Sequence, residues 1–262
     1  MGIKLSISNI AWDAVNDQVV YDHMRLAGYM GLEIAPTRMF PGHPYEKKTE
    51  AQEYVKKLQE EYGLKICSLQ SIWYGRREKI FGAIEEREAL LEYTKKAVDF
   101  AEVVGTENLV FGCPKNRCIG ISDDRKVAVR FFKELGDYAA EHSTVLAMEA
   151  NPVIYETNFI NTTKEAIELI QEVGSIGFKL NLDFGTICYN RENLEELAPY
   201  IDIINHVHIS EPALKLIGKR EEHRKLMGLL RDAAYDRYVS IEMGRQENIM
   251  DVLNTIDYVA TL

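Results

Sequence analysis

The fold is decided by residues 177–183, which read Gly-Phe-Lys-Leu-Asn-Leu-Asp. Successive side chains of a β-strand point to opposite faces, so Lys179, Asn181 and Asp183 share one face and the two leucines share the other. Parallel strands that are buried on both faces read instead as nearly unbroken apolar runs. The alternation therefore predicts a strand with an apolar face against helices and a polar face inside a barrel.

The rest of the chain repeats one unit, a short β-branched run followed by a longer charged, amphipathic stretch. Residues 162–165, Thr-Thr-Lys-Glu, have the spacing of a capping box and predict the start of a helix. The expected strands are 3–8, 31–35, 64–70, 108–112, 144–150, 177–183, 203–209 and 238–243, and the clearest helices are 85–104, 123–142 and 163–173.

Eight strands with eight helical intervals predict an α/β fold, a single parallel (β/α)8 TIM barrel, and we expect residues 1–262 to form one domain. A doubly wound sheet usually has fewer strands and a Gly-rich phosphate turn. Neither a G-x-G-x-x-G motif nor a P-loop follows the first expected strand. The chain length falls in the range in which such barrels fold as one unit.

The composition excludes several functional classes. With 46% hydrophobic and 27% charged residues, the chain is typical of a globular enzyme or binding protein. Its net charge of −10 argues against nucleic-acid binding. We find no signal-peptide pattern, no run as long as a membrane span and no disulfide framework or zinc ribbon among the four cysteines. We therefore expect a cytoplasmic protein with a small-molecule partner and neither a nucleic-acid nor a membrane partner.

Four polar residues fall at the C-terminal ends of four consecutive expected strands, the fifth to the eighth. They are Glu149, Asp183, His208 and Glu242. Active sites of α/β barrels lie at this end of the strands, and three carboxylates converging there would repel one another without a cation. We therefore predict that these residues hold one divalent metal ion. The oxygen-rich ligand set favours Mn²⁺ or Mg²⁺, with Co²⁺ or Zn²⁺ as alternatives.

Four motifs contain these residues: Met148-Glu149-Ala150-Asn151, Asn181-Leu182-Asp183, Asn205-His206-Val207-His208-Ile209 and Ile241-Glu242-Met243. On these motifs the chain resembles the xylose isomerase-like barrel superfamily, specifically its sugar phosphate isomerase/epimerase branch. The resemblance implies the same four metal ligands. It also implies that Glu149 and Glu242 act as catalytic acid and base, and that the protein forms a homodimer or homotetramer.

The sequence departs from ketose 3-epimerases of this superfamily at two positions. Those enzymes carry a substrate-binding histidine three residues after the strand-six aspartate, and an arginine six residues after the strand-seven histidine. The corresponding residues here are Thr186 and Leu214. The resemblance therefore does not extend to the way in which a free-ketose 3-epimerase holds its substrate.

We expect further site residues around the same mouth. Glu33, at the top of the second strand, is predicted to hydrogen-bond substrate hydroxyls, and His206 is predicted to contact substrate or support a metal ligand. Lys115 and Arg117, after strand four, and Arg245, after strand eight, are predicted to hold a phosphate or carboxylate of the substrate. The alternatives are structural roles for Glu33 and His206 and exposed loop charges for the three cations.

Three aromatic residues at strand ends are candidates for the wall of the pocket. Trp12, Trp73 and Tyr155 are predicted to lie against a sugar face, and the alternative is that they only pack.

The predicted activity is that of a divalent-metal-dependent isomerase or epimerase of a sugar or sugar phosphate. The ion would chelate the carbonyl oxygen and the adjacent hydroxyl of the open-chain sugar and stabilise the enediolate that forms when the α-proton is removed. The alternatives are a dehydratase of a keto-sugar or cyclic polyol, an apurinic-site endonuclease and a non-catalytic sugar-binding barrel. The net charge argues against the endonuclease, and the pair of glutamates argues against the non-catalytic barrel.

Overall fold

Eight parallel strands form a closed barrel in the computed structural model, which describes residues 2–262. Each strand pairs with the next along the chain, and β8 pairs with β1 to close the sheet. The strands are β1 (Lys4–Ser8), β2 (Gly31–Ile34), β3 (Lys65–Leu69), β4 (Leu109–Phe111), β5 (Leu146–Glu149), β6 (Phe178–Asp183), β7 (Ile204–Ser210) and β8 (Tyr238–Glu242). The bounds differ from the expected ones by at most two residues. The predicted (β/α)8 barrel is confirmed.

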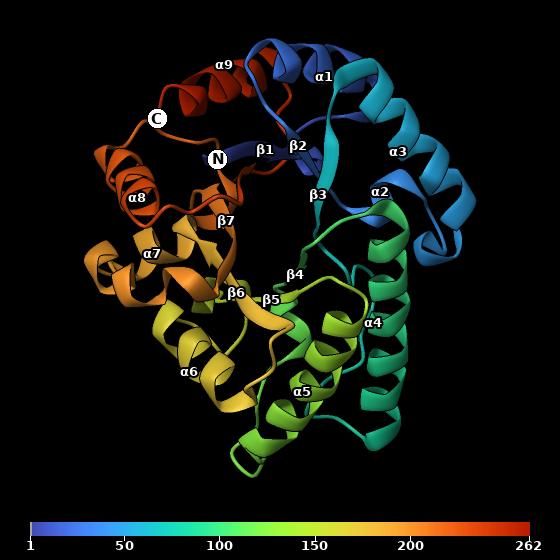
Figure 1. Cartoon of the computed structure of the whole chain (residues 1–262). Helices are drawn as coiled ribbons and strands as arrows, with labels where there is room; N and C mark the ends of the chain where they lie inside the picture. Colours follow the sequence, from blue (N-terminus) through green and yellow to red (C-terminus); the bar gives the residue numbers. More distant parts are fainter. Residues whose placement is uncertain (1) are drawn as a thin grey trace.

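Helices form a ring around the barrel (Figure 1). They are α1 (Asp17–Leu26), α2 (Pro36–Met39), α3 (Lys48–Tyr62), α4 (Ile84–Val104), α5 (Arg125–Glu141), α6 (Thr163–Val173), α7 (Phe184–Asn190), α8 (Glu221–Asp232) and α9 (Ile249–Ala260). Short 3₁₀ helices occupy several of the loops, and a longer one, Leu194–Ile203, precedes β7. Within the ring α4 packs against α5, and α9 packs against α1. No helix among residues 2–262 is both long and apolar enough to span a bilayer.

The capping box predicted at the start of α6 is present. The Thr162 hydroxyl accepts a hydrogen bond from the Glu165 N–H at 3.2 Å, and the Glu165 carboxylate accepts one from the Thr162 N–H at 3.2 Å. Two N–H groups that the helix leaves without partners are thereby satisfied, which fixes where α6 begins.

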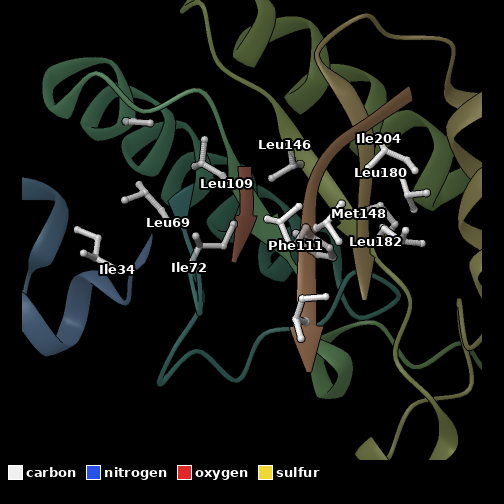
Figure 2. Close-up of a cluster of buried hydrophobic side chains, with 14 of the residues drawn as sticks. Ile34, Leu69, Ile72, Leu109, Phe111, Leu146, Met148, Leu180, Leu182 and Ile204 are labelled. Atoms are coloured by element: carbon white, nitrogen blue, oxygen red, sulfur yellow. The ribbon is translucent and has the colours of Figure 1, made fainter. Parts of the chain in front are cut away.

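The hydrophobic core lies between the strands and the ring of helices. Outward-facing strand residues such as Phe111, Met148 and Leu182 are fully buried, and Figure 2 shows part of this layer with side chains from β2 to β7. On the helix side, Phe132 of α5 stacks on Phe178 of β6 with ring centroids 4.9 Å apart. Burial of each such side chain contributes about 1.5–3 kcal/mol, and together they hold each helix on its strand.

The inside of the barrel is polar. Branched apolar side chains usually fill the interior of such barrels, whereas Ser6, Glu33, Asn181 and His206 are buried here. Glu33 on β2 reaches across the interior to within 3.1 Å of His208 on β7. The polar face of residues 177–183 lines the inside of the barrel, as the alternation predicted. We refer to the buried polar side chains along the barrel axis, among them Glu33, Asn181 and His206, as the polar column.

Candidate metal centre and active site

The four predicted metal ligands lie together at the C-terminal end of the barrel. Glu149, Asp183 and Glu242 are the last residues of β5, β6 and β8, and His208 lies on the intervening strand β7. One donor atom from each residue lies within 4.8 Å of the other three, and all four residues are buried. We refer to these four residues as the C-terminal cluster.

Burial makes this concentration of negative charge unfavourable. It raises the pKa of Asp183, where the charge of Glu149 adds to the effect, and it also raises the pKa of Glu242. Burial alone would lower the pKa of His208, but the charges of Glu242 and Glu33 outweigh burial and hold that pKa well above its usual range. A positive charge at the centre of the cluster would relieve the repulsion between the carboxylates.

The donor set fits a hard divalent cation. Nδ1 of His208 faces the carboxylates, 2.9 Å from Glu149 Oε1 and 3.2 Å from Glu242 Oε2. Nε2 of His208 lies 3.1 Å from Glu33 Oε2, so a proton on Nε2 leaves the Nδ1 lone pair directed into the cluster. Asn181 Oδ1 is buried beside the cluster without a hydrogen-bond partner. Carboxylate oxygens with one imidazole suit Mn²⁺ or Mg²⁺ and also accept Co²⁺ or Zn²⁺.

Two amides fix the orientation of the Glu149 carboxylate. Asn181 Nδ2 donates to Oε1 at 2.7 Å, and Asn151 Nδ2 donates to Oε2 at 2.9 Å. Asn151 is in turn held by Arg117, which donates to Asn151 Oδ1 at 2.9 Å and to the Glu149 carbonyl at 2.9 Å. The end of β5 and its carboxylate are therefore held by a connected set of hydrogen bonds.

Asp183 is fixed at the start of α7. Its Oδ2 accepts a hydrogen bond from the Thr186 N–H at 2.7 Å and so caps the helix. The Ser210 hydroxyl donates to Oδ1 and accepts from the Gly185 N–H at 2.7 Å. A Cβ at Gly185 would lie 2.8 Å from Ser210 Oγ, so this contact requires glycine. The sequence analysis did not single out Asn151 or Ser210 as site residues.

A cavity of about 190 Å³ opens over the C-terminal cluster, and its lining includes Gln70, Tyr155 and Leu214. The Tyr155 hydroxyl accepts a hydrogen bond from the Ala213 N–H at 2.9 Å, which joins the loops that follow β5 and β7. Burial and the charge of Asp183 raise the pKa of Tyr155 to about 12. The side chain therefore stays a neutral phenol at the edge of the cavity.

The sequence matches one family model over most of its length. That model, described as a xylose isomerase-like TIM barrel, covers residues 22–259. The chain belongs to this family. The resemblance drawn from the four motifs is thereby confirmed at the level of the family.

Several proteins similar to this xylose isomerase-like barrel are sugar epimerases. D-psicose 3-epimerase of Enterocloster bolteae is 34% identical over 97 residues, which are 37% of this chain and 32% of that protein. The match thus spans about a third of the relative's length.

Solved structures resemble this xylose isomerase-like barrel over nearly its whole length. The 3-keto-D-glucoside 4-epimerase of E. coli has a TM-score of 0.77 at 21% identity, covering 99% of this chain and 100% of that one. The probable 3-DHS dehydratase of Bacillus anthracis has a TM-score of 0.71 at 17% identity, covering 99% of each chain. At these identities the likeness shows the fold, and the chemistry has to be argued from the site.

The three cations predicted to hold a substrate anion are not brought to the cavity of this xylose isomerase-like barrel. Arg117 is fully buried, and its guanidinium braces β5 as described above. Lys115 is exposed and lies 2.6 Å from Glu156, and Arg245 is exposed and lies 3.3 Å from Asp13. None of the three cations is among the described residues that line the cavity. We therefore assign Arg117 a structural role and place Lys115 and Arg245 outside the site.

Two predicted substrate contacts lie beneath the C-terminal cluster instead. Glu33 is fully buried, and its Oε2 lies 3.1 Å from Nε2 of both His206 and His208. Gln70 donates to Glu33 Oε1 at 3.1 Å. Burial alone would raise the pKa of Glu33, but the neighbouring histidines, His208 foremost, outweigh it and lower the pKa. Glu33 therefore contacts both histidines, and neither Glu33 nor His206 is among the described residues that line the cavity.

Of the three aromatic candidates, Tyr155 lines the cavity and the two tryptophans do not. Trp12 is buried, and its indole N–H donates to Asp17 at 2.8 Å. Trp73 is also buried and donates to Thr94 at 2.8 Å. Trp12, which was predicted to contact substrate, instead packs its ring in the core of this xylose isomerase-like barrel.

Proposed function

We propose that this chain is a divalent-metal-dependent epimerase or isomerase of a small, uncharged sugar that carries a carbonyl group. The observation that carries the proposal is the meeting of Glu149 and Glu242 with Asp183 and His208 in one buried cluster beneath a cavity. Two carboxylates beside one substrate carbon can remove and return a proton, which is the step that epimerases and isomerases share. The epimerases among the similar proteins support a sugar substrate.

The C-terminal cluster would hold the ion through its carboxylate oxygens and Nδ1 of His208. The bound ion supplies a Lewis acid that polarises the substrate carbonyl and acidifies the adjacent C–H. Asp183 contributes as a ligand and not as a base, because Ser210 and Thr186 already donate to its two oxygens. Glu33 keeps the Nδ1 lone pair of His208 directed at the ion.

The two glutamates differ in a way that suits acid–base work. Amides of Asn181 and Asn151 fix both oxygens of Glu149. Glu242 contacts His208 and lines the cavity, so its carboxylate borders the space in which a substrate would lie. In our assignment one glutamate removes the proton next to the carbonyl. Return by the other to the opposite face gives an epimer, and return to the adjacent carbon gives an aldose–ketose isomer.

The cavity favours a substrate without a phosphate or carboxylate group. No Lys or Arg is among the described residues that line it, and carboxylates form its floor. Leu214 lines the wall where ketose 3-epimerases have their arginine, and Thr186 is buried with its hydroxyl donating to the Ala150 carbonyl at 2.8 Å. Gln70 and Tyr155 remain as polar groups for substrate hydroxyls.

Proton exchange with solvent tests this proposal. The Mn²⁺-loaded protein is incubated in D₂O with free ketoses, aldoses and 3-keto-glycosides, and with phosphate esters of the same sugars. Nuclear magnetic resonance then follows deuterium at the carbon next to the carbonyl and the appearance of an epimer or isomer. We expect exchange with at least one free sugar and none with its phosphate ester.

Each other outcome of this experiment contradicts part of the proposal. Exchange confined to the phosphate esters would rule out an uncharged substrate. Loss of a hydroxyl without an epimer or isomer would indicate a dehydratase. The absence of exchange with every sugar would remove the proposed activity.

A further inference from the structure

A second cavity, of about 350 Å³, opens at the N-terminal end of the barrel. Lys4, Lys65 and Tyr238 are the first residues of β1, β3 and β8 and line this cavity together with Arg237, which directly precedes β8. In a parallel barrel the starts and ends of the strands lie at opposite ends of the axis, so this space is separate from the C-terminal cluster. We refer to it as the N-terminal cavity.

The cations of the N-terminal cavity have no carboxylate partners. Within residues 2–262, no carboxylate oxygen lies within 4.0 Å of the charged nitrogens of Lys4, Lys65 or Arg237. Lys4 Nζ lies instead 5.4 Å from the centre of the Tyr238 ring. Burial and the charge of Arg237 lower the pKa of Lys179 outside the cavity, and the charge of Asp202 partly offsets them.

The inner wall of the cavity is polar, buried and well fixed. Asn108, Asn205 and His206 line it and are all buried. Asn205 Nδ2 donates to Asn108 Oδ1 at 2.8 Å and to the Glu107 carbonyl at 3.0 Å. Of the described lining residues, Glu107 is the one carboxylate among three cations.

Glycine at position 31 makes room for the aromatic wall. A Cβ at Gly31 would lie 2.6 Å from the Tyr238 ring and 2.8 Å from Cys67 Sγ. The Tyr238 ring therefore lies against the backbone of β2, and the Lys4 ammonium lies over the same ring. The cavity is thus a shaped recess and not only a group of surface charges.

We propose that the N-terminal cavity binds a compact oxyanion, a phosphate or carboxylate group, between Lys4, Lys65 and Arg237. Unpaired cations around a concave polar surface attract an anion, and a guanidinium group can donate to two oxygens at once. The net charge of −10 and the size of the cavity favour a small anion over nucleic acid. The buried polar residues of the barrel interior connect the two ends, because His206 of the cavity wall lies 3.1 Å from Glu33.

Isothermal titration calorimetry of the full chain with inorganic phosphate, sulfate and acetate tests this, at an ionic strength held constant with sodium chloride. We expect one anion per chain. Lys65→Gln and Arg237→Gln each remove one charge-assisted hydrogen bond and are expected to weaken binding on the order of tenfold to a hundredfold. Lys164→Gln, on the exposed side of α6, removes the same charge elsewhere and is expected to bind like the parent. Lys65 is exposed, so its variant keeps the fold.

Comparison of the three anions shows whether the cavity prefers a phosphate or a carboxylate group. Tighter binding of phosphate than of acetate identifies a phosphate group, and the reverse identifies a carboxylate. No heat with any of the three anions would overturn the proposal, and so would an equal loss in Lys164→Gln. Binding that is lost in Asp183→Asn and kept in Lys65→Gln and Arg237→Gln would place the anion at the metal centre and overturn the proposal, whatever the sugar experiment shows.

Discussion

The two ends of the barrel carry opposite charges on the same polar column. At the C-terminal end three carboxylates surround His208, and at the N-terminal end Lys4, Lys65 and Arg237 surround a cavity. Strand β6 shows the change within one strand, from a lysine near its start through an asparagine to an aspartate at its end. One alternating strand pattern thus places basic side chains near one end of the barrel and carboxylates at the other, where we propose sites for an anion and for a cation.

The largest difference between the ends is expected in turnover. Glu149→Gln and Glu242→Gln keep the shape of the side chain but remove the group that transfers a proton, so turnover of the sugar identified by exchange should fall about 10²–10⁴-fold. Glu53→Gln, on the exposed side of α3, is the matched control and should keep the parental rate. Parental turnover in both cluster variants would remove these glutamates from the mechanism.

The next largest effect concerns stability at the C-terminal end. Arg117→Met removes the Arg117 donors to the Glu149 carbonyl and to the Asn151 amide oxygen, and each such loss costs about 1–3 kcal/mol. The Ile160 carbonyl also loses Arg117 but keeps the Asn151 N–H at 3.1 Å. Urea denaturation should therefore show a loss of about 2 kcal/mol or more in the free energy of unfolding. Lys115→Met, two residues earlier and exposed, should change it by less than about 0.5 kcal/mol. Equal effects of the two variants would contradict a bracing role for Arg117.

A smaller effect, on the affinity for Mn²⁺, is expected from a change of Glu33 in the interior of the barrel. Glu33→Gln replaces an oxygen that faces two histidine nitrogens with an amide that can also donate, so Nδ1 of His208 is no longer kept free for the ion. The affinity for Mn²⁺, measured by calorimetry, should fall about 10–100-fold, with Glu53→Gln again as control. Unchanged affinity in Glu33→Gln would mean that Glu33 does not orient the ligand.

The smallest effects are expected at the N-terminal end in the absence of an anion. Lys65→Gln and Arg237→Gln remove charges that repel one another, so the free energy of unfolding should change by less than about 0.5 kcal/mol. Added phosphate should raise the thermal midpoint of the parent and have little effect on the variants. A parental response to phosphate in both variants would show that the two ends do not differ in the way described.

The fold and the C-terminal cluster were predictable because both depend on local features. The alternation of polar and apolar residues shows which face of the sheet a side chain occupies. The end of the strand shows how far along the barrel axis the residue lies, and Asp183 and Glu242 are the last residues of their strands, as expected. The depth of Glu33 was not predictable, since it depends on a register shift between β2 and β3 beside Leu32 and Glu33. At its position below the C-terminal cluster, the Glu33 carboxylate contacts His206 and not the cavity.

The positions of Lys115 and Arg117 could not be predicted because they depend on the conformation of the loop that follows β4. Cys113 adopts a left-handed φ of 43° and residues 114–116 form a 3₁₀ turn, after which Arg117 enters the interior while Lys115 stays outside. The acceptors that hold Arg117 lie more than thirty residues further along the chain, so the triplet 115–117 alone cannot show which cation is buried. The N-terminal cations were overlooked because a lysine at the start of a strand reads as an ordinary solvated charge.

The most direct test of the metal centre is isothermal titration calorimetry with Mn²⁺. The parent and Asp183→Ala are first stripped of metal with a chelator and then titrated in the same way. Asp183 supplies one ligand of the cluster and caps α7, so circular dichroism should first show that the variant keeps the barrel. We predict one tightly bound Mn²⁺ per parent chain and no binding to Asp183→Ala. Binding of Mn²⁺ to Asp183→Ala with the parental affinity and stoichiometry would contradict the assignment of the metal centre.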